Sequence, residues 1–211
     1  MSEHTGRRVV ANLNLTLDGR YCGPAGPQDH AWVVPYAVTD LARDHLTDLW
    51  RTATTALMGR VNAEGFLGYW PPVAHDEGAD PRDRGFGDWL ARTEKVVLSR
   101  TLTASPWEGV RVENAPAAAV VDALRAREGG DILVPCSASL IRPLLAADRV
   151  DRLALMVVPE FVGGGPRLFE DGLPAHRWSL ASHAAGGDGA LALVYDRLRC
   201  GPSRARVRGP G

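Results

Sequence analysis

The pattern of apolar and polar positions predicts that the chain begins with alternating strands and helices. Residues 9–15 form an apolar run that ends at the turn sequence Leu17-Asp18-Gly19. Residues 40–52 carry apolar side chains at helical spacing, and Thr39 before them is a suitable N-cap. A β-type run at residues 54–58 leads through Gly59-Arg60 into a helix at about residues 62–69, which we expect Pro71-Pro72 to stop. This order is typical of an α/β fold.

The rest of the chain continues this alternation and then becomes β-rich. Residues 73–87 are rich in Asp, Gly, Pro and Arg, which predicts an exposed loop. Short strands follow at residues 95–98 and 110–112, and Asn114 is a suitable cap for a helix that runs to Arg127. A strand at residues 131–135 leads into another helix, in which Pro143 must either cause a kink or lie near the start. Residues 153–158 form a strand, and residues 178–182 and 190–197 a terminal β-hairpin.

Composition and charge exclude several classes of protein. The 211 residues are 45% hydrophobic, which is typical of one domain, assigned to residues 1–198; the basic Gly/Pro/Ser-rich residues 199–211 are expected to be a disordered tail. The formal net charge is −1 and the positive charges are scattered, so we expect no nucleic-acid partner. No apolar run approaches the roughly 20 residues that cross a bilayer, and the N-terminus is polar, so we expect a cytoplasmic protein without a membrane partner. Cys22, Cys136 and Cys200 are far apart, which predicts neither disulfides nor a metal site.

Three junctions at strand ends carry residues that suit phosphate groups. They are Met58-Gly59-Arg60, Leu98-Ser99-Arg100-Thr101 and Pro135-Cys136-Ser137-Ala138-Ser139. In an open α/β sheet, ligands bind beyond the carboxyl ends of the strands, where helix N-termini offer N–H groups to anions. Each junction alone also fits an ordinary helix cap or a solvated arginine, but three together indicate a nucleotide. Because the sequence contains neither G-x-G-x-x-G nor a Walker motif, the ordinary Rossmann and P-loop folds do not apply.

These residues resemble those of the dihydrofolate-reductase-like family, including the reductase domain of bifunctional riboflavin-biosynthesis deaminase-reductases. The resemblance runs from about Arg8 to Leu198 and rests on Leu17-Asp18-Gly19, Leu57-Met58-Gly59-Arg60, Tyr69-Trp70-Pro71, Val97-Leu98-Ser99-Arg100-Thr101, Asp131-Ile132-Leu133-Val134 with Ser137-Ala138-Ser139-Leu140, and Val162-Gly163-Gly164-Gly165. It implies an α/β fold with a central mixed β-sheet flanked by helices and a C-terminal β-hairpin. It also implies that NADPH lies across the carboxyl edge of the sheet.

The resemblance further implies which residues contact the cofactor. The adenosine end and its 2′-phosphate would be surrounded by Gly59, Arg60, Val61, Ser99, Arg100 and Thr101. Ala11 and Asp18 would approach the nicotinamide, and the pyrophosphate would lie against Pro135, Cys136, Ser137, Ala138, Ser139 and Leu140. Relatives usually have glycine at the position of Cys136, because the backbone must approach the pyrophosphate closely there. Cys136 equally fits a small buried residue at a strand end.

The chain offers two candidates, His45 and Asp18, for the residue that would supply a proton. Hydride transfer belongs to the nicotinamide, so the protein must orient the substrate and supply or admit a proton. Dihydrofolate reductases carry a carboxylate on the helix before the glycine-arginine motif, but helical spacing directs Asp40, Asp44 and Asp48 away from the apolar face. His45 is the ionisable side chain nearest that face, and it fits both proton exchange and simple packing. Asp18 fits ordinary turn chemistry, while the resemblance places it beside the reacting ring.

The expected substrate is a small planar molecule. Trp32, Phe66 and Trp70 are candidates to stack on it, although such residues also build cores. The lack of an inward carboxylate argues against dihydrofolate, and the lack of a zinc-type deaminase signature indicates a stand-alone reductase. We therefore expect an NADPH-dependent oxidoreductase that reduces a pyrimidine, pterin or related heterocycle. The alternative is a protein that binds or sequesters such a ligand without turnover, and a homodimer through the C-terminal hairpin is a further expectation.

Overall fold

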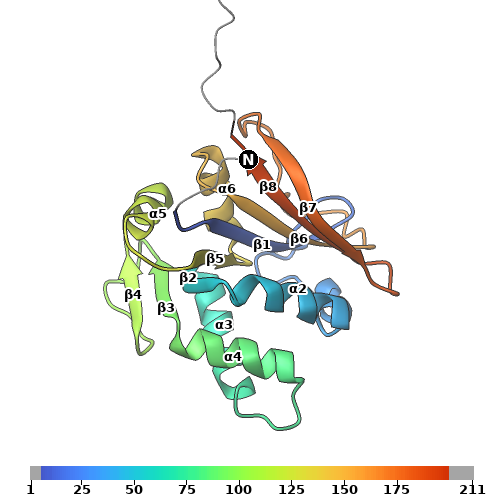
Figure 1. Ribbon diagram of the computed structural model, residues 1–211. Coiled ribbons are helices and arrows are strands. Elements are labelled where there is room, and N and C mark those ends of the chain that lie inside the picture. Colours follow the sequence, from blue (N-terminus) through green and yellow to red (C-terminus); the bar gives the residue numbers. More distant parts are fainter. Residues whose placement is uncertain (1–5, 200–211) are drawn as a thin grey trace, which may run out of the picture.

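The computed structural model describes residues 6–199, in which eight strands form one sheet in the order β4-β3-β2-β5-β1-β6-β8-β7 (Figure 1). The strands are β1 (Val9–Thr16), β2 (Ala53–Gly59), β3 (Glu94–Leu98), β4 (Val110–Glu113), β5 (Asp131–Pro135), β6 (Arg152–Val158), β7 (Arg177–Ala185) and β8 (Leu191–Leu198). The helices are the 3-10 turn η1 (Ala31–Val33), α1 (Val34–Ala37), α2 (Asp40–Trp50), α3 (Arg60–Val73), α4 (Pro81–Arg92), α5 (Ala117–Arg125) and α6 (Ala138–Ala146). Strands β1 to β6 pair in parallel with one another, whereas β8 is antiparallel to both β6 and β7.

Both faces of the central sheet are covered by helices, because parallel strands bury side chains on each side. Helices α5 and α6 lie on one face, and α2, α3 and α4 lie on the other (Figure 1). Strand β1 illustrates the alternation: Ala11 packs in the α5/α6 core, whereas Val10 packs with Leu49 of α2 on the opposite face. Almost continuous burial along β1, β2 and β5 follows from this arrangement. The mixed α/β sheet with a C-terminal hairpin confirms the predicted fold class.

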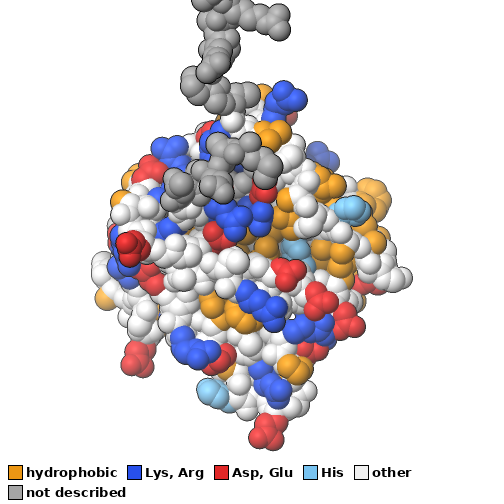
Figure 2. Space-filling model, viewed as in Figure 1, with side chains coloured by type: hydrophobic (Ala, Val, Ile, Leu, Met, Phe, Trp, Pro, Cys, Tyr) orange, Lys and Arg blue, Asp and Glu red, His pale blue; other side chains and the backbone are white. Residues whose placement is uncertain are grey.

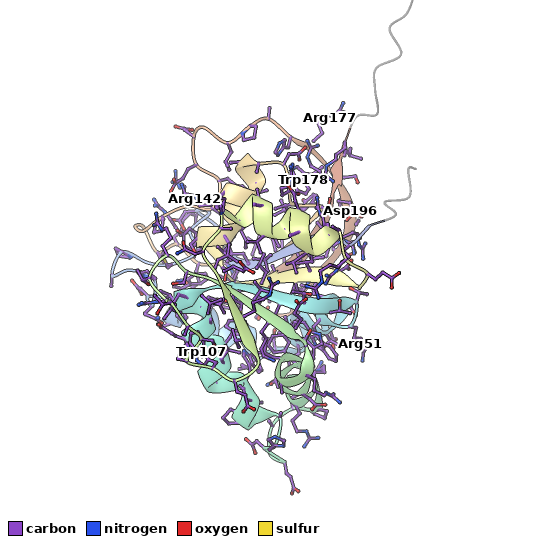
Figure 3. All side chains as sticks on the ribbon, turned by 90° about the vertical axis from the view of Figure 1, so that its left-hand side faces the viewer. Arg51, Trp107, Arg142, Arg177, Trp178 and Asp196 are labelled. Atoms are coloured by element: carbon purple, nitrogen blue, oxygen red, sulfur yellow. The ribbon has the colours of Figure 1, made fainter. Side chains whose placement is uncertain are left out.

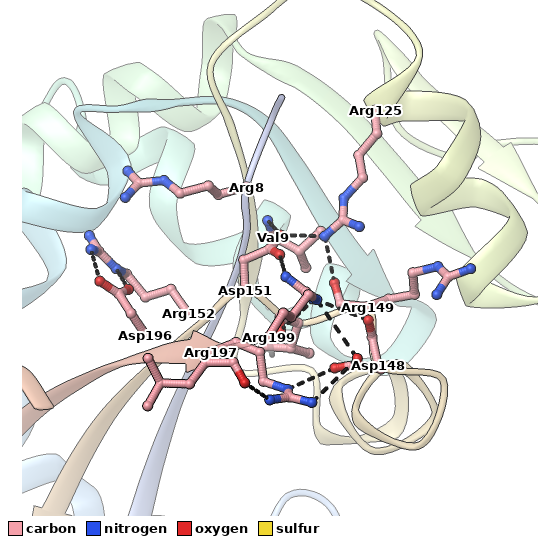
Figure 4. A network of polar contacts seen from close by, with 12 residues as sticks. Arg8, Val9, Arg125, Asp148, Arg149, Asp151, Arg152, Asp196, Arg197 and Arg199 are labelled. Atoms are coloured by element: carbon pink, nitrogen blue, oxygen red, sulfur yellow. Dashed lines mark hydrogen bonds and ion pairs between the residues drawn. The ribbon is translucent and has the colours of Figure 1, made fainter. Parts of the chain in front are cut away.

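Charged side chains gather at the amino-terminal edge of the sheet (Figure 4). The Asp151 carboxylate accepts a hydrogen bond from the Val9 N–H at 2.8 Å and also contacts Arg125 and Arg199. Nearby, the Arg197 guanidinium donates to Asp148 at 2.8 Å. These bonds join the start of β1, helix α5 and the end of β8. Because Arg199 takes part, the first residue of the predicted tail is held here, and residues 200–211 of that prediction lie outside the described residues.

The helix after β2 differs from its prediction at both ends. It starts at Arg60 rather than near residue 62, and it runs through Pro71 and Pro72 to Val73. The prolines lie in the last turn, where they remove N–H donors without ending the helix, and the Ala74 N–H still donates to the Trp70 carbonyl at 3.2 Å. The expected stop at Pro71-Pro72 was therefore wrong.

The predicted loop at residues 73–87 was also wrong, because α4 starts at Pro81. The Asp80 carboxylate accepts a hydrogen bond from the Arg82 N–H at 2.8 Å, and Pro81 occupies the first turn, so the helix has an ordinary start signal. Its apolar side is narrow but consists of fully buried Phe86 and Leu90. At the other end the Lys95 Nζ donates to three carbonyls, those of residues 90, 91 and 93, and completes the helix C-terminus.

The predicted cap of the next helix needs a smaller correction. Helix α5 spans Ala117–Arg125 with Pro116 at the N-cap position and no side-chain cap bond, so Asn114 does not cap it. The remaining strands agree with the sequence pattern, and Thr39 caps α2 by accepting a hydrogen bond from the Ala42 N–H at 3.3 Å. Pro143 lies inside α6. In the described part of the chain, no helix combines the length and apolar character that crossing a membrane requires.

The hairpin of β7 and β8 leaves apolar side chains at the surface. Leu180, Leu191 and Leu198 are 50%, 40% and 45% exposed. Figure 2 shows hydrophobic side chains gathered on the side of the molecule where these two strands lie. Strand β7 is one of the two edge strands of the sheet, and nearly all of its residues are exposed.

Candidate active site

The carboxyl ends of β3, β2 and β5 lie next to one another at one edge of the sheet. The parallel register places Leu98 of β3 beside Gly59 of β2, and β5 is the neighbour of β2 on its other side. The three junctions singled out in the sequence are therefore brought to a common edge. Buried Ser137 joins two of them, since its Oγ accepts a hydrogen bond from the Gly59 N–H at 3.1 Å and donates to Asn62 Oδ1 at 2.9 Å.

Two helices begin at this edge without side-chain caps. The N-cap residues are Gly59 for α3 and Ser137 for α6, and neither makes a side-chain cap bond among the described residues. The first N–H groups of such helices lack intrahelical partners and form a natural anion site. A Cβ at Gly59 would lie 3.0 Å from Ser139 Oγ, so glycine allows the two helix starts to approach each other closely.

The third junction, which follows β3, forms a small turn at the same edge of the sheet. Ser99 Oγ accepts hydrogen bonds from the N–H groups of Thr101 and Leu102 at 3.2 and 3.0 Å, which fixes the chain after β3. The Arg60 guanidinium reaches across to Thr101 Oγ1 at 3.4 Å and forms an ion pair with Glu64 at 3.2 Å. Arg100 is exposed beside them. Cationic and hydroxyl groups from α3 and the β3 turn thus lie together at the surface.

Cys136 adopts a backbone conformation that favours glycine. Its φ is 48°, in the left-handed region, and its N–H donates to the Asn12 carbonyl at 2.8 Å. Burial raises the pKa of the Cys136 thiol to about 11, so it stays protonated at neutral pH. The backbone geometry gives a physical reason to expect glycine at this position.

A cavity of 490 Å³ opens beside these junctions. Aromatic rings form much of its wall, together with Leu13 and Asn14 of β1 and with Cys136, which follows β5. The lining residues are Leu13, Asn14, Tyr21, Pro27, Gln28, His30, Trp32, Val33, Val61, Asn62, Gly65, Phe66, Tyr69, Trp70, Cys136, Ser137, Ala138 and Ser139. The three aromatic residues predicted to contact a substrate, Trp32, Phe66 and Trp70, are all among them.

The aromatic wall on α3 is supported by α4. The ring centroids of Trp70 and Phe86 are 4.6 Å apart, and those of Phe66 and Phe86 are 6.1 Å apart, both with edge-to-face geometry. Gly87 lets the helices approach, because a Cβ there would lie 2.5 Å from the Trp70 carbonyl oxygen. The helix that the sequence pattern missed therefore positions the cavity wall.

Asp18, His45 and Ala11 are among the predicted site residues that do not line the cavity. Asp18 accepts hydrogen bonds from the Thr16 hydroxyl and from Arg20 Nε, which lower the pKa of its carboxyl group. Burial lowers the pKa of His45 to about 4, and its Nε2 has no hydrogen-bond partner among the described residues. Ala11 is wholly buried within β1.

The other predicted residues divide between the cavity and its surroundings. Val61, Cys136, Ser137, Ala138 and Ser139 line it, whereas Pro135 and Leu140 are buried next to the lining residues in the chain. As predicted, the side chains of the three aspartates of α2 at positions 40, 44 and 48 point to solvent rather than into the core.

Sequence reasoning missed the loop side of the cavity. Asn14, Tyr21, Gln28 and His30 line it, together with Asn62 at the start of α3. The Pro/Gly-rich residues 23–27 marked a loop, but nothing in their pattern showed that it folds back onto the end of β1. Asn62 had a usable signal, because it lies in the first helical turn after Gly59.

Comparisons with solved structures agree on the fold. The chain matches a protein assigned by name to riboflavin biosynthesis from Shewanella sp. PV-4 with a TM-score of 0.69 and 18% identity, covering 91% of this chain and 99% of that one. It matches a diaminohydroxyphosphoribosylaminopyrimidine deaminase/5-amino-6-(5-phosphoribosylamino)uracil reductase from Thermotoga maritima with a TM-score of 0.63 and 14% identity, covering 92% of this chain but 57% of that one. Dihydrofolate reductase from Enterococcus faecalis, complexed with NADP(H), matches with a TM-score of 0.57 and 16% identity over 90% of this chain and 96% of that one.

The family comparison extends over nearly the whole described chain. A search of curated proteins finds no match. The RibD C-terminal domain family, in contrast, matches residues 7–192, from the start of β1 into β8. The chain therefore belongs to the RibD C-terminal domain family.

Proposed function

We propose that this protein is a reductase that transfers hydride from NADPH to a small conjugated heterocycle such as a pyrimidine or pterin. The observation that carries the proposal is the common sheet edge, where two uncapped helix starts and the Gly59–Ser137 bond adjoin an aromatic cavity. The names of the relatives support it, since one is a uracil reductase and another was solved with NADP(H).

The residues at this edge fit a phosphorylated dinucleotide. The N–H groups at the start of α6, at positions 137–139, and those at the start of α3 would hold the pyrophosphate. Arg60, Arg100, Ser99 and Thr101 would hold the 2′-phosphate, for which guanidinium forks and hydroxyl donors are well suited. When bound, NADPH supplies the hydride, and the protein orients the acceptor against it.

The aromatic wall would hold the acceptor ring. Phe66 and Trp70 keep a fixed orientation because they pack on Phe86, so a planar ligand meets a preformed surface. Among the described residues, neither Asp nor Glu lines the cavity, and Asp18 and His45 lie outside its lining. The lining includes the imidazole of His30, so we assign the supply of the proton to His30 or to water that enters the cavity.

A cofactor titration tests the proposal. Energy transfer from tryptophan to bound NADPH reports binding, and NADH serves as the cofactor without the 2′-phosphate. We expect the protein to prefer NADPH, and Arg60→Ala to weaken NADPH binding by about tenfold through the loss of a charge-assisted hydrogen bond. Arg177→Ala on β7 is the matched control and should leave binding unchanged. Equal affinity for both cofactors in both proteins would contradict the proposal.

A second candidate function is binding without turnover. The cavity lining without a carboxylate favours it, as does the Cys136 side chain at the position where the backbone should approach the pyrophosphate. Sustained oxidation of NADPH with any heterocyclic acceptor would exclude this alternative.

A further inference from the structure

We propose that the cavity selects an uncharged, planar heterocycle that carries no phosphate group. This inference rests on the proposed function, because it specifies the acceptor of the same site. It sets the chain apart from the Thermotoga maritima relative, whose name specifies a phosphoribosylamino compound as its substrate.

The charge of the cavity lining carries the inference. Among the described residues, none that lines the cavity is lysine, arginine, aspartate or glutamate. His30 is the lining side chain able to take a positive charge, and it is exposed to water. A phosphate dianion that leaves water needs cations or several N–H donors in compensation. The lining offers such donors at the start of α6, where the pyrophosphate of the cofactor would lie.

Two guanidinium groups close in the chain to lining residues, those of Arg20 and Arg142, are already paired. Arg20 forms an ion pair with Asp18 at 3.2 Å and also donates to the Gly165 carbonyl. Arg142 of α6, labelled in Figure 3, pairs with Glu170. Neither guanidinium belongs to the cavity lining.

A second hollow of 380 Å³ beside the cavity does not provide a phosphate site either. The two share Ser139, and the second hollow is lined by Arg142 together with Glu170 and Asp171. One guanidinium against two carboxylates leaves this surface with an excess of negative charge. A phosphate tail that extended from the cavity into the hollow would meet repulsion.

The groups that do line the cavity define what it recognises. The aromatic side chains Tyr21, Trp32, Phe66, Tyr69 and Trp70 offer flat apolar surfaces for a conjugated ring. Asn14, Gln28 and Asn62 add amides, which both donate and accept hydrogen bonds. This combination suits a heterocycle with ring N–H and carbonyl groups along its edge.

A matched pair of probes tests the inference. One is 5-amino-6-(5-phosphoribosylamino)uracil, and the other is the same compound after phosphatase treatment. Titration calorimetry with the full chain measures binding of each, and NADPH oxidation is followed separately. We expect the dephosphorylated compound to bind at least tenfold more tightly. Equal or tighter binding of the phosphorylated compound overturns the inference, and so does the absence of binding by both. Binding with the expected preference but without NADPH oxidation supports the inference and contradicts the reductase.

A positive charge introduced into the cavity lining provides a second test of the inference. Gln28→Arg places a guanidinium at the exposed rim, and Gln28→Met is a control without charge. We expect the arginine variant to bind the phosphorylated probe at least tenfold more tightly than the unmodified protein does, with no such gain for the methionine variant. If the arginine variant gains nothing, the phosphate does not lie near this lining and the inference fails.

Discussion

Replacing Cys136 by glycine and by alanine should reveal the strain stored at the end of β5. A residue with a Cβ in the left-handed region costs about 1–2 kcal/mol. Glycine loses about 0.5–1 kcal/mol more conformational entropy on folding than alanine does. With the φ of 48° at this position, the first effect exceeds the second, so Cys136→Gly should be more stable than Cys136→Ala by about 0.5–1 kcal/mol.

Urea unfolding measures this difference directly. Both variants lack the thiol, so their comparison removes its packing contribution and isolates the backbone. The matched control compares the unmodified protein with Ala138→Gly, because Ala138 lies in the first turn of α6 and is 5% exposed. There the sign should reverse, because alanine is favoured in a helix by up to about 1 kcal/mol.

The order of the urea midpoints distinguishes a strained backbone from a relaxed one. If Cys136→Ala unfolds at the same urea concentration as Cys136→Gly or at a higher one, with equal slopes, the backbone at this position is not strained. Backbone strain at Cys136 would then be refuted.

Three further predictions concern stability and assembly. Burial lowers the pKa of His45 in the folded protein to about 4, while its value in the unfolded chain is about 6.5, so the unfolded chain binds a proton more readily between these pH values. The free energy of unfolding should therefore fall by up to about 3 kcal/mol as the pH drops from 6.5 to 4. In urea titrations, the stability of His45→Leu should depend less on pH over this window. Gly87→Ala should destabilise the protein by about 2 kcal/mol in urea unfolding, because the added Cβ meets the Trp70 carbonyl. Gly68→Ala is the control, because its Cβ meets nothing within 4 Å, and it should not destabilise the protein; equal effects of the two substitutions would contradict the packing argument. We propose that the chain forms a homodimer through the exposed leucines of the β7–β8 hairpin. Light scattering should then give twice the chain mass, and Leu180→Lys should shift the measured mass toward that of the monomer. A monomeric unmodified protein would exclude the homodimer.

The strands and most helices could be predicted because their signals are local. Residues 9–15, 54–58 and 131–135 are short apolar runs with turn residues after them, and all three became central parallel strands. Helix α4 could not be read in this way, because glycine and charged residues surround its few apolar positions. Phe86 is recognisable as a core residue only when the rings of α3 that it packs against are known.

The candidate site was predictable where it depends on strand ends and not where it depends on a loop. The junctions at Gly59, Ser99 and Ser137 meet because parallel strands end at one edge, which is a property of the fold class. His45 follows the predicted helical spacing, but its position relative to a cavity depends on how α2 crosses the sheet. The residues of the 21–33 loop that line the cavity were invisible for the same reason, since a loop without periodicity gives no sign of its direction.

The bonds that hold Val9, Asp151 and Arg199 together bring the start of β1 and the end of β8 to the amino-terminal edge of the parallel strands, whereas Cys136 and Ser137 of the cavity lining follow the carboxyl end of β5. A partner or affinity tag attached beside Val9 or Arg199 would therefore lie at the edge of the sheet away from these lining residues. The same proximity would allow a short linker to join the chain beside Val9 to the chain beside Arg199, with the chain reopened at the surface turn between β7 and β8.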